Sequence, residues 1–123
     1  MESNFVELHT PSSVFNTSLH KISTTPIKIM NGSNLKATTL SYVSMCNVTA
    51  DTSTFSLYVN NGTDNYYVYK DYPIAAGTTF IVEKEQAEYI KLKPTWEVYL
   101  VSDTADSLDA VVSQVDNEGR RIT

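Results

Sequence analysis

Apolar and polar side chains alternate every second residue along much of this chain, the pattern of β-strands with one buried face. The alternation is clearest where Phe55, Leu57 and Val59 are separated by polar residues. Asn61-Gly62 follows, a dipeptide that tolerates the positive φ angles of the type I′ turns that close hairpins. Residues 66–70 then run back as the predicted hairpin partner.

The same alternation, bounded by Gly, Pro, Asn and Asp, predicts strands elsewhere in the chain. In the long strand 37–48, strict alternation would place Val43 and Met45 on one face and Leu40 and Tyr42 on the other. Only residues 83–88 are rich in helix formers, enough for a turn or two. The remaining strands are predicted at residues 27–29, 78–82, 89–92, 96–101 and 108–115.

Seven or eight short strands, spaced roughly 8–12 residues apart, predict an all-β sandwich or barrel with antiparallel pairing. We predict the sandwich, of immunoglobulin-like or jelly-roll-like type. A chain of 123 residues fits one domain, assigned here to residues 21–115. Residues 1–20 are predicted to form an extended arm and residues 116–123 a flexible tail. Such an arm either frays or packs on a neighbouring subunit through Phe5, Val14 and Phe15.

Composition narrows the range of partners. Charged residues make up 19% of the chain and the net charge is −5, which argues against a nucleic acid because phosphates require clustered Lys and Arg. No apolar run approaches the roughly 18 residues that span a bilayer. The start of the chain lacks the basic and apolar regions of a signal peptide. With Cys46 as the only cysteine, no internal disulfide can form, so we expect synthesis in a reducing cytoplasm.

Candidate catalytic and metal-binding residues are few and scattered. His9 and His20 fall in or next to the predicted arm, and no Cys or carboxylate at ligand spacing accompanies them. Cys46 lies within a predicted strand, which favours a buried, inert thiol over a nucleophile. We therefore predict that the chain is not an enzyme and has no metal or cofactor.

Two further motifs are interpreted as turn signals. Asp103, Asp106 and Asp109 are spaced loosely like a calcium loop but lack its glycine and its distal bidentate Glu. Asp103 and Asp106 are instead expected to shape a turn by bonding their own backbone. The glycosylation sequons that begin at Asn16, Asn31, Asn47 and Asn61 fit turns better than glycans, because no signal peptide accompanies them.

The tyrosines are the remaining candidates. The chain has eight, and Tyr66, Tyr67, Tyr69 and Tyr72 gather around the predicted hairpin. Alternation places Tyr66 and Tyr67 on opposite faces. An exposed aromatic ridge suits a protein interface, it would equally suit stacking on a sugar ring, and ordinary cross-strand packing is the third possibility.

Three segments carry a resemblance to a known family. They are Val101 to Ser113, the unit Cys46-Asn47-Val48-Thr49 followed by Phe55 to Val59, and Pro73-Ile74-Ala75-Ala76-Gly77-Thr78-Thr79-Phe80. Between Ile22 and Val115 the chain resembles small virion structural proteins of tailed bacteriophages, of the type known from marine and cyanobacterial phages. It departs from them at Pro94-Thr95-Trp96, where relatives have a Gly-Asp turn, and residues 1–20 lie outside the similarity.

The resemblance implies a non-enzymatic part of a phage particle that is made in the host bacterial cytoplasm. The first expectation is a capsid decoration protein that contacts other virion proteins and copies of itself. A neck or tail protein is the alternative within the particle. A host-glycan-binding module is the alternative of a different class. None of these involves a nucleic acid or a membrane.

Overall fold

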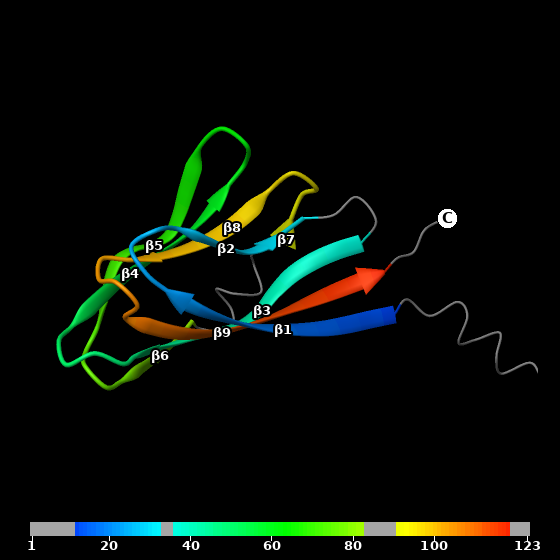
Figure 1. Ribbon diagram of the computed structural model, residues 1–123. Coiled ribbons are helices and arrows are strands. Elements are labelled where there is room, and N and C mark those ends of the chain that lie inside the picture. Colours follow the sequence, from blue (N-terminus) through cyan, green and yellow to red (C-terminus); the bar gives the residue numbers. More distant parts are fainter. Residues whose placement is uncertain (1–11, 33–35, 83–90, 119–123) are drawn as a thin grey trace, which may run out of the picture.

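The computed structural model describes residues 12–32, 36–82 and 91–118, and this part of the chain contains strands, turns and bends but no helix (Figure 1). No helix capable of crossing a membrane occurs in it. Its strands are β1 (Ser12–Ile22), β2 (Ile27–Asn31), β3 (Lys36–Asn47), β4 (Ser53–Asn60), β5 (Asn65–Ile74), β6 (Thr79–Ile81), β7 (Lys91–Leu92), β8 (Glu97–Ser102) and β9 (Leu108–Glu118).

The strands form two sheets that pack face to face. The first, sheet A, has the order β1-β9-β3-β6, with β7 also paired to β3. The second, sheet B, has the order β2-β8-β4-β5. Every pairing is antiparallel. The predicted antiparallel β-sandwich is confirmed, and its two layers lie one above the other in Figure 1.

The core lies between the sheets and consists of side chains from their facing sides. Burial of this apolar surface is the main force that holds the layers together. Phe55, Leu57, Val98 and Leu100 of sheet B are fully buried against Leu40, Val43, Met45, Leu108 and Val112 of sheet A.

The face of β3 predicted for Leu40 was wrong. Leu40, Val43 and Met45 are all buried in the same core, although strict alternation separates Leu40 from the other two. The register between β3 and β9 shifts between Leu40 and Tyr42. Such a bulge inserts one extra residue and turns the strand over, so Leu40 points inward and Tyr42 outward.

The predicted hairpin is present, but its turn differs from the prediction. Asn60 pairs with Asn65, so the loop has four residues rather than the two of a type I′ turn. Gly62 has a positive φ of 101°. The side chain of Asn61 accepts hydrogen bonds from the amides of Thr63 and Asp64 at 3.0 and 2.8 Å. The side chain therefore closes the loop, as expected for Asn in turns.

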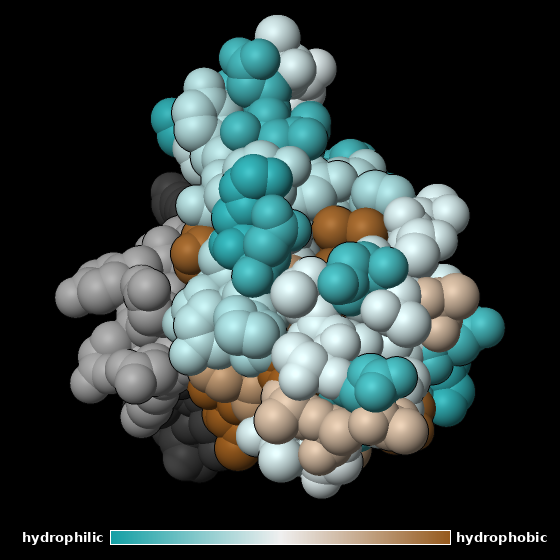
Figure 2. All heavy atoms as spheres, turned by 90° about the vertical axis from the view of Figure 1, so that its left-hand side faces the viewer, coloured by the Kyte–Doolittle hydropathy of each residue, from teal (hydrophilic) through white to brown (hydrophobic). Residues whose placement is uncertain are grey.

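The hairpin of β4 and β5 projects beyond the rest of the sandwich (Figure 1). In Figure 2 its end forms a largely hydrophilic knob, whereas the hydrophobic surface lies lower, on the body of the molecule. The tip of the hairpin is therefore polar, and the core does not extend into it.

The ends of the domain also differ from the sequence prediction. Residues 12–20, assigned to an arm, form most of β1, which pairs with β9 over its whole length from Ser12 to Ile22. β9 continues to Glu118, into the predicted tail. The partner strand imposes this structure, because the local pattern of β1 is mostly polar. Residues 1–11, with Phe5 and His9, lie outside the described residues.

Two of the sequon asparagines act in turns, as predicted. Asn61 closes the hairpin loop, and Asn47 is fully buried at the end of β3. The amide group of Asn47 donates to the carbonyls of Asp51 and Ile74, both at 2.8 Å, while its oxygen accepts from the Thr49 amide at 2.9 Å. Asn16 donates instead to Asp116 at 3.0 Å. The side chain of Asn31 lies outside the described part of the chain.

Candidate interaction surfaces

The residues considered for catalysis or metal binding do not converge in the described structure. His20 lies half-buried on β1 with its Nε2 atom 2.8 Å from Ser18 Oγ, and burial lowers its pKa. Cys46 lies on the outer side of β3 and is half-buried, so the expectation of a buried thiol was wrong. Across residues 12–32, 36–82 and 91–118, no three His, Cys, Asp or Glu side chains come close enough to hold a metal ion.

The side chains of Asp103 and Asp109, in the β8–β9 region, have different partners. Asp103 accepts a hydrogen bond from the backbone amide of Thr54 at 3.0 Å, and this bond lowers its pKa. Asp103 also bonds its own backbone, as predicted, and its side chain in addition ties its loop to β4. Asp106 adopts a φ of 49°. Asp109 holds Lys21 at 2.7 Å.

Two bulges in β5 decide where its tyrosines point. Tyr66 pairs with Val59, Tyr69 with Leu57 and Tyr72 with Phe55, and the register shifts between each of these positions. Directly paired residues share a face, so all three tyrosines lie on the side of the core-facing residues of β4. The bulges have replaced a period of two with a period of three.

Tyr69 and Tyr72 pack into an aromatic cluster that bridges the two sheets. Their ring centroids lie 5.4 and 5.7 Å from the ring of Phe55, and 5.6 and 4.7 Å from the ring of Phe80 on β6. β5 and β6 are edge strands of different sheets. These rings therefore close one side of the sandwich, at distances typical of favourable aromatic pairs.

Tyr67 belongs to a second aromatic group on the outer face of sheet B. It pairs with Tyr58, Tyr58 pairs with Tyr99, and Tyr99 pairs with Lys28, so one row crosses all four strands. The ring centroids of Tyr58 lie 5.1 Å from Tyr67 and 5.4 Å from Tyr99, the latter pair stacked. Lys70 Nζ lies 4.6 Å above the ring of Tyr67. We call these three tyrosines the outer tyrosine row.

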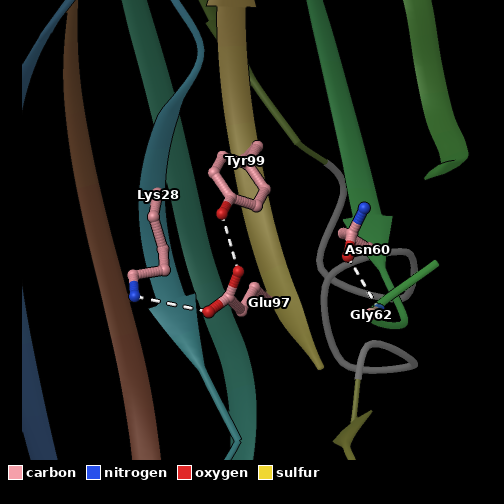
Figure 3. Close-up of polar contacts among 5 residues, drawn as sticks. All are labelled: Lys28, Asn60, Gly62, Glu97 and Tyr99. Atoms are coloured by element: carbon pink, nitrogen blue, oxygen red, sulfur yellow. Dashed lines mark hydrogen bonds and ion pairs between the residues drawn. The ribbon is translucent and has the colours of Figure 1, made fainter. Parts of the chain in front are cut away.

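A hydrogen-bonded chain fixes the Lys28 end of the row (Figure 3). Tyr99 donates its hydroxyl proton to Glu97 Oε1 at 2.6 Å, and Lys28 Nζ lies 3.4 Å from Glu97 Oε2. The hydrogen bond from Tyr99, together with the nearby Lys28, lowers the pKa of Glu97. The same hydrogen bond to Glu97 raises the pKa of Tyr99. Burial raises the pKa of Tyr58. In the row, Tyr58 is stacked on Tyr99 and tilted against Tyr67.

The outer face of sheet A carries apolar side chains that sequence analysis missed. Leu19 pairs with Val111, and Ser44 pairs with both Val111 and Ile81, which makes one row across β1, β9, β3 and β6. Leu19 is 76% exposed and Ile81 52% exposed. Tyr42, also exposed, lies two residues from Ser44 on the same face. We call Leu19, Val111, Ile81 and Tyr42 the outer apolar patch.

A parity signal could have revealed part of this patch. Leu19 and Ile22 are three residues apart, so in a strand they must point to opposite faces, and both cannot reach the core. Val14 and Phe15, which were predicted to contact a neighbouring subunit, lie within β1. Their side chains, like Phe5 as a whole, lie outside the described part of the molecule.

Comparison with known proteins finds likenesses among solved structures. No family model matches the sequence, and no curated protein matches it. The chain is similar to a chain in the structure of infectious bursal disease virus strain Gx, with a TM-score of 0.49 and 9% sequence identity. The match covers 88% of this chain and 32% of the viral one, so this chain spans about a third of that protein's length. At this level of similarity nothing about the role of this chain follows.

Proposed function

We propose that this chain is a non-enzymatic structural subunit of a tailed-phage virion, and specifically a capsid decoration protein made in the host bacterial cytoplasm. The resemblance of residues 22–115 to small phage structural proteins supports the assignment of this chain to a phage particle. The outer apolar patch supports attachment to another protein of that particle, and it is the observation on which the proposal depends.

The patch has the properties of a contact surface. Leu19 and Ile81 expose more than half of their surface although neither is needed for the core, and Val111 and Tyr42 lie beside them. Contiguous exposed apolar side chains on a sheet face mark protein contacts. Among the described residues, Lys21 and Asp109 at the border of the patch form an ion pair of 2.7 Å. A capsid surface with its own apolar row would fit this face.

The first test is incorporation into particles. Ile81→Asp places a charge in the patch and should reduce the copies per purified particle at least tenfold, as measured by mass spectrometry. Tyr66→Asp is the matched control, because Tyr66 is 57% exposed but lies on the hairpin of sheet B. Equal incorporation of both variants, or a wild-type chain missing from the particle, would contradict the proposal.

Copy number separates decoration from the neck or tail alternative. A decoration protein is present in hundreds of copies, while neck and tail proteins are present in six, twelve or a small multiple, because closed symmetry fixes their number. The same mass-spectrometric count therefore distinguishes the two placements.

The glycan-binding alternative is supported by Tyr66. In the outer tyrosine row, Tyr58 is stacked on Tyr99 and packs against Tyr67, and Lys70 lies over the ring of Tyr67. These contacts occupy ring faces that a sugar would need, although Tyr67 is 45% exposed. Tyr66 is exposed, and among the described residues no other ring contacts it. If the chain binds host glycans, Tyr66→Ala should abolish binding on a glycan array while Tyr67→Ala should leave most of it.

A further inference from the structure

The four outer edges of the two sheets differ in how they are protected. β2 has five residues and a bulge between Lys28 and Met30. β5 has two bulges and contains Pro73. The edge of sheet A beside β3 is divided between β6 and β7, which have three and two residues. β1, in contrast, has eleven residues in unbroken register with β9.

These features matter because an edge strand presents unpaired N–H and C=O groups that can bind another strand. Short strands, bulges, prolines and charged side chains prevent such pairing. Three edges carry at least one of these protections. β1 contains no proline and no bulge, and its one lysine stands near its end. Within the described residues, β1 pairs with β9 alone.

We propose that β1 pairs with β1 of a second copy of this chain, antiparallel and about a two-fold axis at Thr17. An antiparallel pair of identical strands repeats every contact on both sides of its axis. With the axis at Thr17, all eleven residues from Ser12 to Ile22 overlap. Odd-numbered residues then pair with odd-numbered residues and even with even. This is required because only every second residue of an edge strand points its N–H and C=O groups away from the sheet.

The charges of β1 do not oppose a second copy as the occupant of this edge. Lys21 is the one Lys, Arg, Asp or Glu of β1, and Asp109 of the same chain already holds it at 2.7 Å. In the proposed pair Lys21 lies opposite Ser13 of the other copy. The two lysines stand eight positions apart along the strands, or about 27 Å. The centre of the pair, Asn16 to Leu19, is uncharged, so two chains of net charge −5 can meet there without repulsion between opposed residues.

The proposed pair also continues a surface described above. Leu19 lies two residues from Thr17 on the outer face of sheet A, at the edge nearest the axis. Pairing two copies would join their outer apolar patches into one face across a continuous sheet. The second copy therefore doubles the surface available to a further protein.

The test is the mass of the full chain in solution. Wild type should sediment at twice the 13.7 kDa of one chain. Thr17→Lys places two ammonium groups opposite one another and should give monomers, as should Thr17→Asp. An equimolar mixture of the two variants should recover the dimer, because the opposed charges then attract. Thr17 is exposed and shares a hydrogen bond only with Ser113 Oγ, so each variant should keep the wild-type circular dichroism spectrum.

Thr79→Lys is the matched control, since it places the same charge on an exposed threonine of the opposite edge strand of sheet A. It should leave the dimer intact. The proposal would be overturned if the wild-type chain were monomeric even at 100 times the lowest concentration that the assay detects. It would also be overturned if Thr17→Lys stayed dimeric, or if Thr79→Lys lost the dimer to the same extent.

A second measurement captures the proposed dimer by a cross-link instead of disrupting it. In a chain that carries Cys46→Ser and Thr17→Cys, mild oxidation should join the two copies, because opposed Cα atoms in an antiparallel pair lie about 4.5–5.5 Å apart. Absence of this cross-link in a dimer would overturn the two-fold register. The dimer and the virion role fail separately: a chain found in particles as a monomer overturns only the dimer, and a dimer missing from particles overturns only the role.

Discussion

β1 and β5 are edge strands of nearly equal length in the two sheets, yet they use their residues in opposite ways. β5 has two bulges and turns Tyr69 and Tyr72 towards Phe55. β1 has no bulge, and its residues paired with core-facing positions of β9 include the polar Ser18 and His20, while Leu19 points outward. The edge strand β5 closes the sandwich, and the edge strand β1 leaves Leu19 exposed.

The difference teaches that the presence or absence of bulges decides whether an edge strand directs its side chains into the core or keeps a regular backbone for pairing. The bulges of β5 direct aromatic rings inward at every third residue and make the backbone irregular. The regular backbone of β1 contributes less to the core but keeps a full row of pairing groups. Edge β5 therefore serves stability, and edge β1 is suited to contact.

The largest effect should come from the aromatic cluster behind β5. Phe55→Ala removes a fully buried ring that contacts Tyr69, Tyr72 and Phe80, and should lower the free energy of unfolding by about 3–5 kcal/mol. Leu19→Ala on β1 should change it by no more than about 0.5 kcal/mol, since the side chain is exposed. Urea denaturation of both variants measures this, and similar losses would refute the contrast between the edges.

The second effect tests the bulge at Asp71. Its φ of 49° lies in the left-handed region, which a β-branched residue adopts only at a cost of about 1–2 kcal/mol. Asp71→Val should therefore destabilise the protein by that amount, whereas Asp71→Gly should be neutral or stabilising. If thermal denaturation shows both variants to be alike, the backbone at this bulge is not strained as described.

The third effect concerns the hydrogen bond that holds the same bulge. The amide of Asp71 donates to Ser56 Oγ at 3.0 Å, and Ser56 is buried. Ser56→Ala leaves that amide without this partner and should cost about 1 kcal/mol. Thr17→Ala, which removes an exposed hydroxyl pair with Ser113 on β1, is the control and should be close to neutral in urea denaturation.

The smallest effect is a pH dependence confined to β1. Burial lowers the pKa of His20 below its ordinary value of 6.5, so the folded state binds fewer protons than the unfolded state. The stability that neutral His20 provides is present above pH 6.5 and is lost as the pH falls towards the folded pKa. His20→Gln should flatten the stability curve between pH 8 and pH 5, measured by chemical denaturation. An unchanged curve would assign the dependence to other groups.

The sequence predicted those elements whose pattern is local. Phe55, Leu57 and Val59 lie on the core side of β4 as alternation required, and Asn61-Gly62 lies in the hairpin loop that follows. Bulges escaped prediction because one extra residue leaves no local mark, which is why Leu40 was assigned to the wrong face. β1 escaped because its strand structure comes from pairing with β9.

For the candidate surfaces, local alternation was sufficient only within one hairpin. It placed Tyr66 and Tyr67 on opposite faces, which the structure confirms. It could not bring Tyr99 beside Tyr58, because that contact depends on β8 lying next to β4. The outer apolar patch likewise joins residues of four strands, and strand order is not written in any one of them.

The bulges of β5 have a consequence for how the gene can change in length. Val68 and Asp71 are the residues that each register shift leaves over. Loss of either codon would remove one bulge and leave every tyrosine of the strand on its present face. In β1, the loss of a single codon would turn over every residue on one side of the deletion. β5 can therefore lose either of these two residues without turning its tyrosines over, while the length of β1 is constrained.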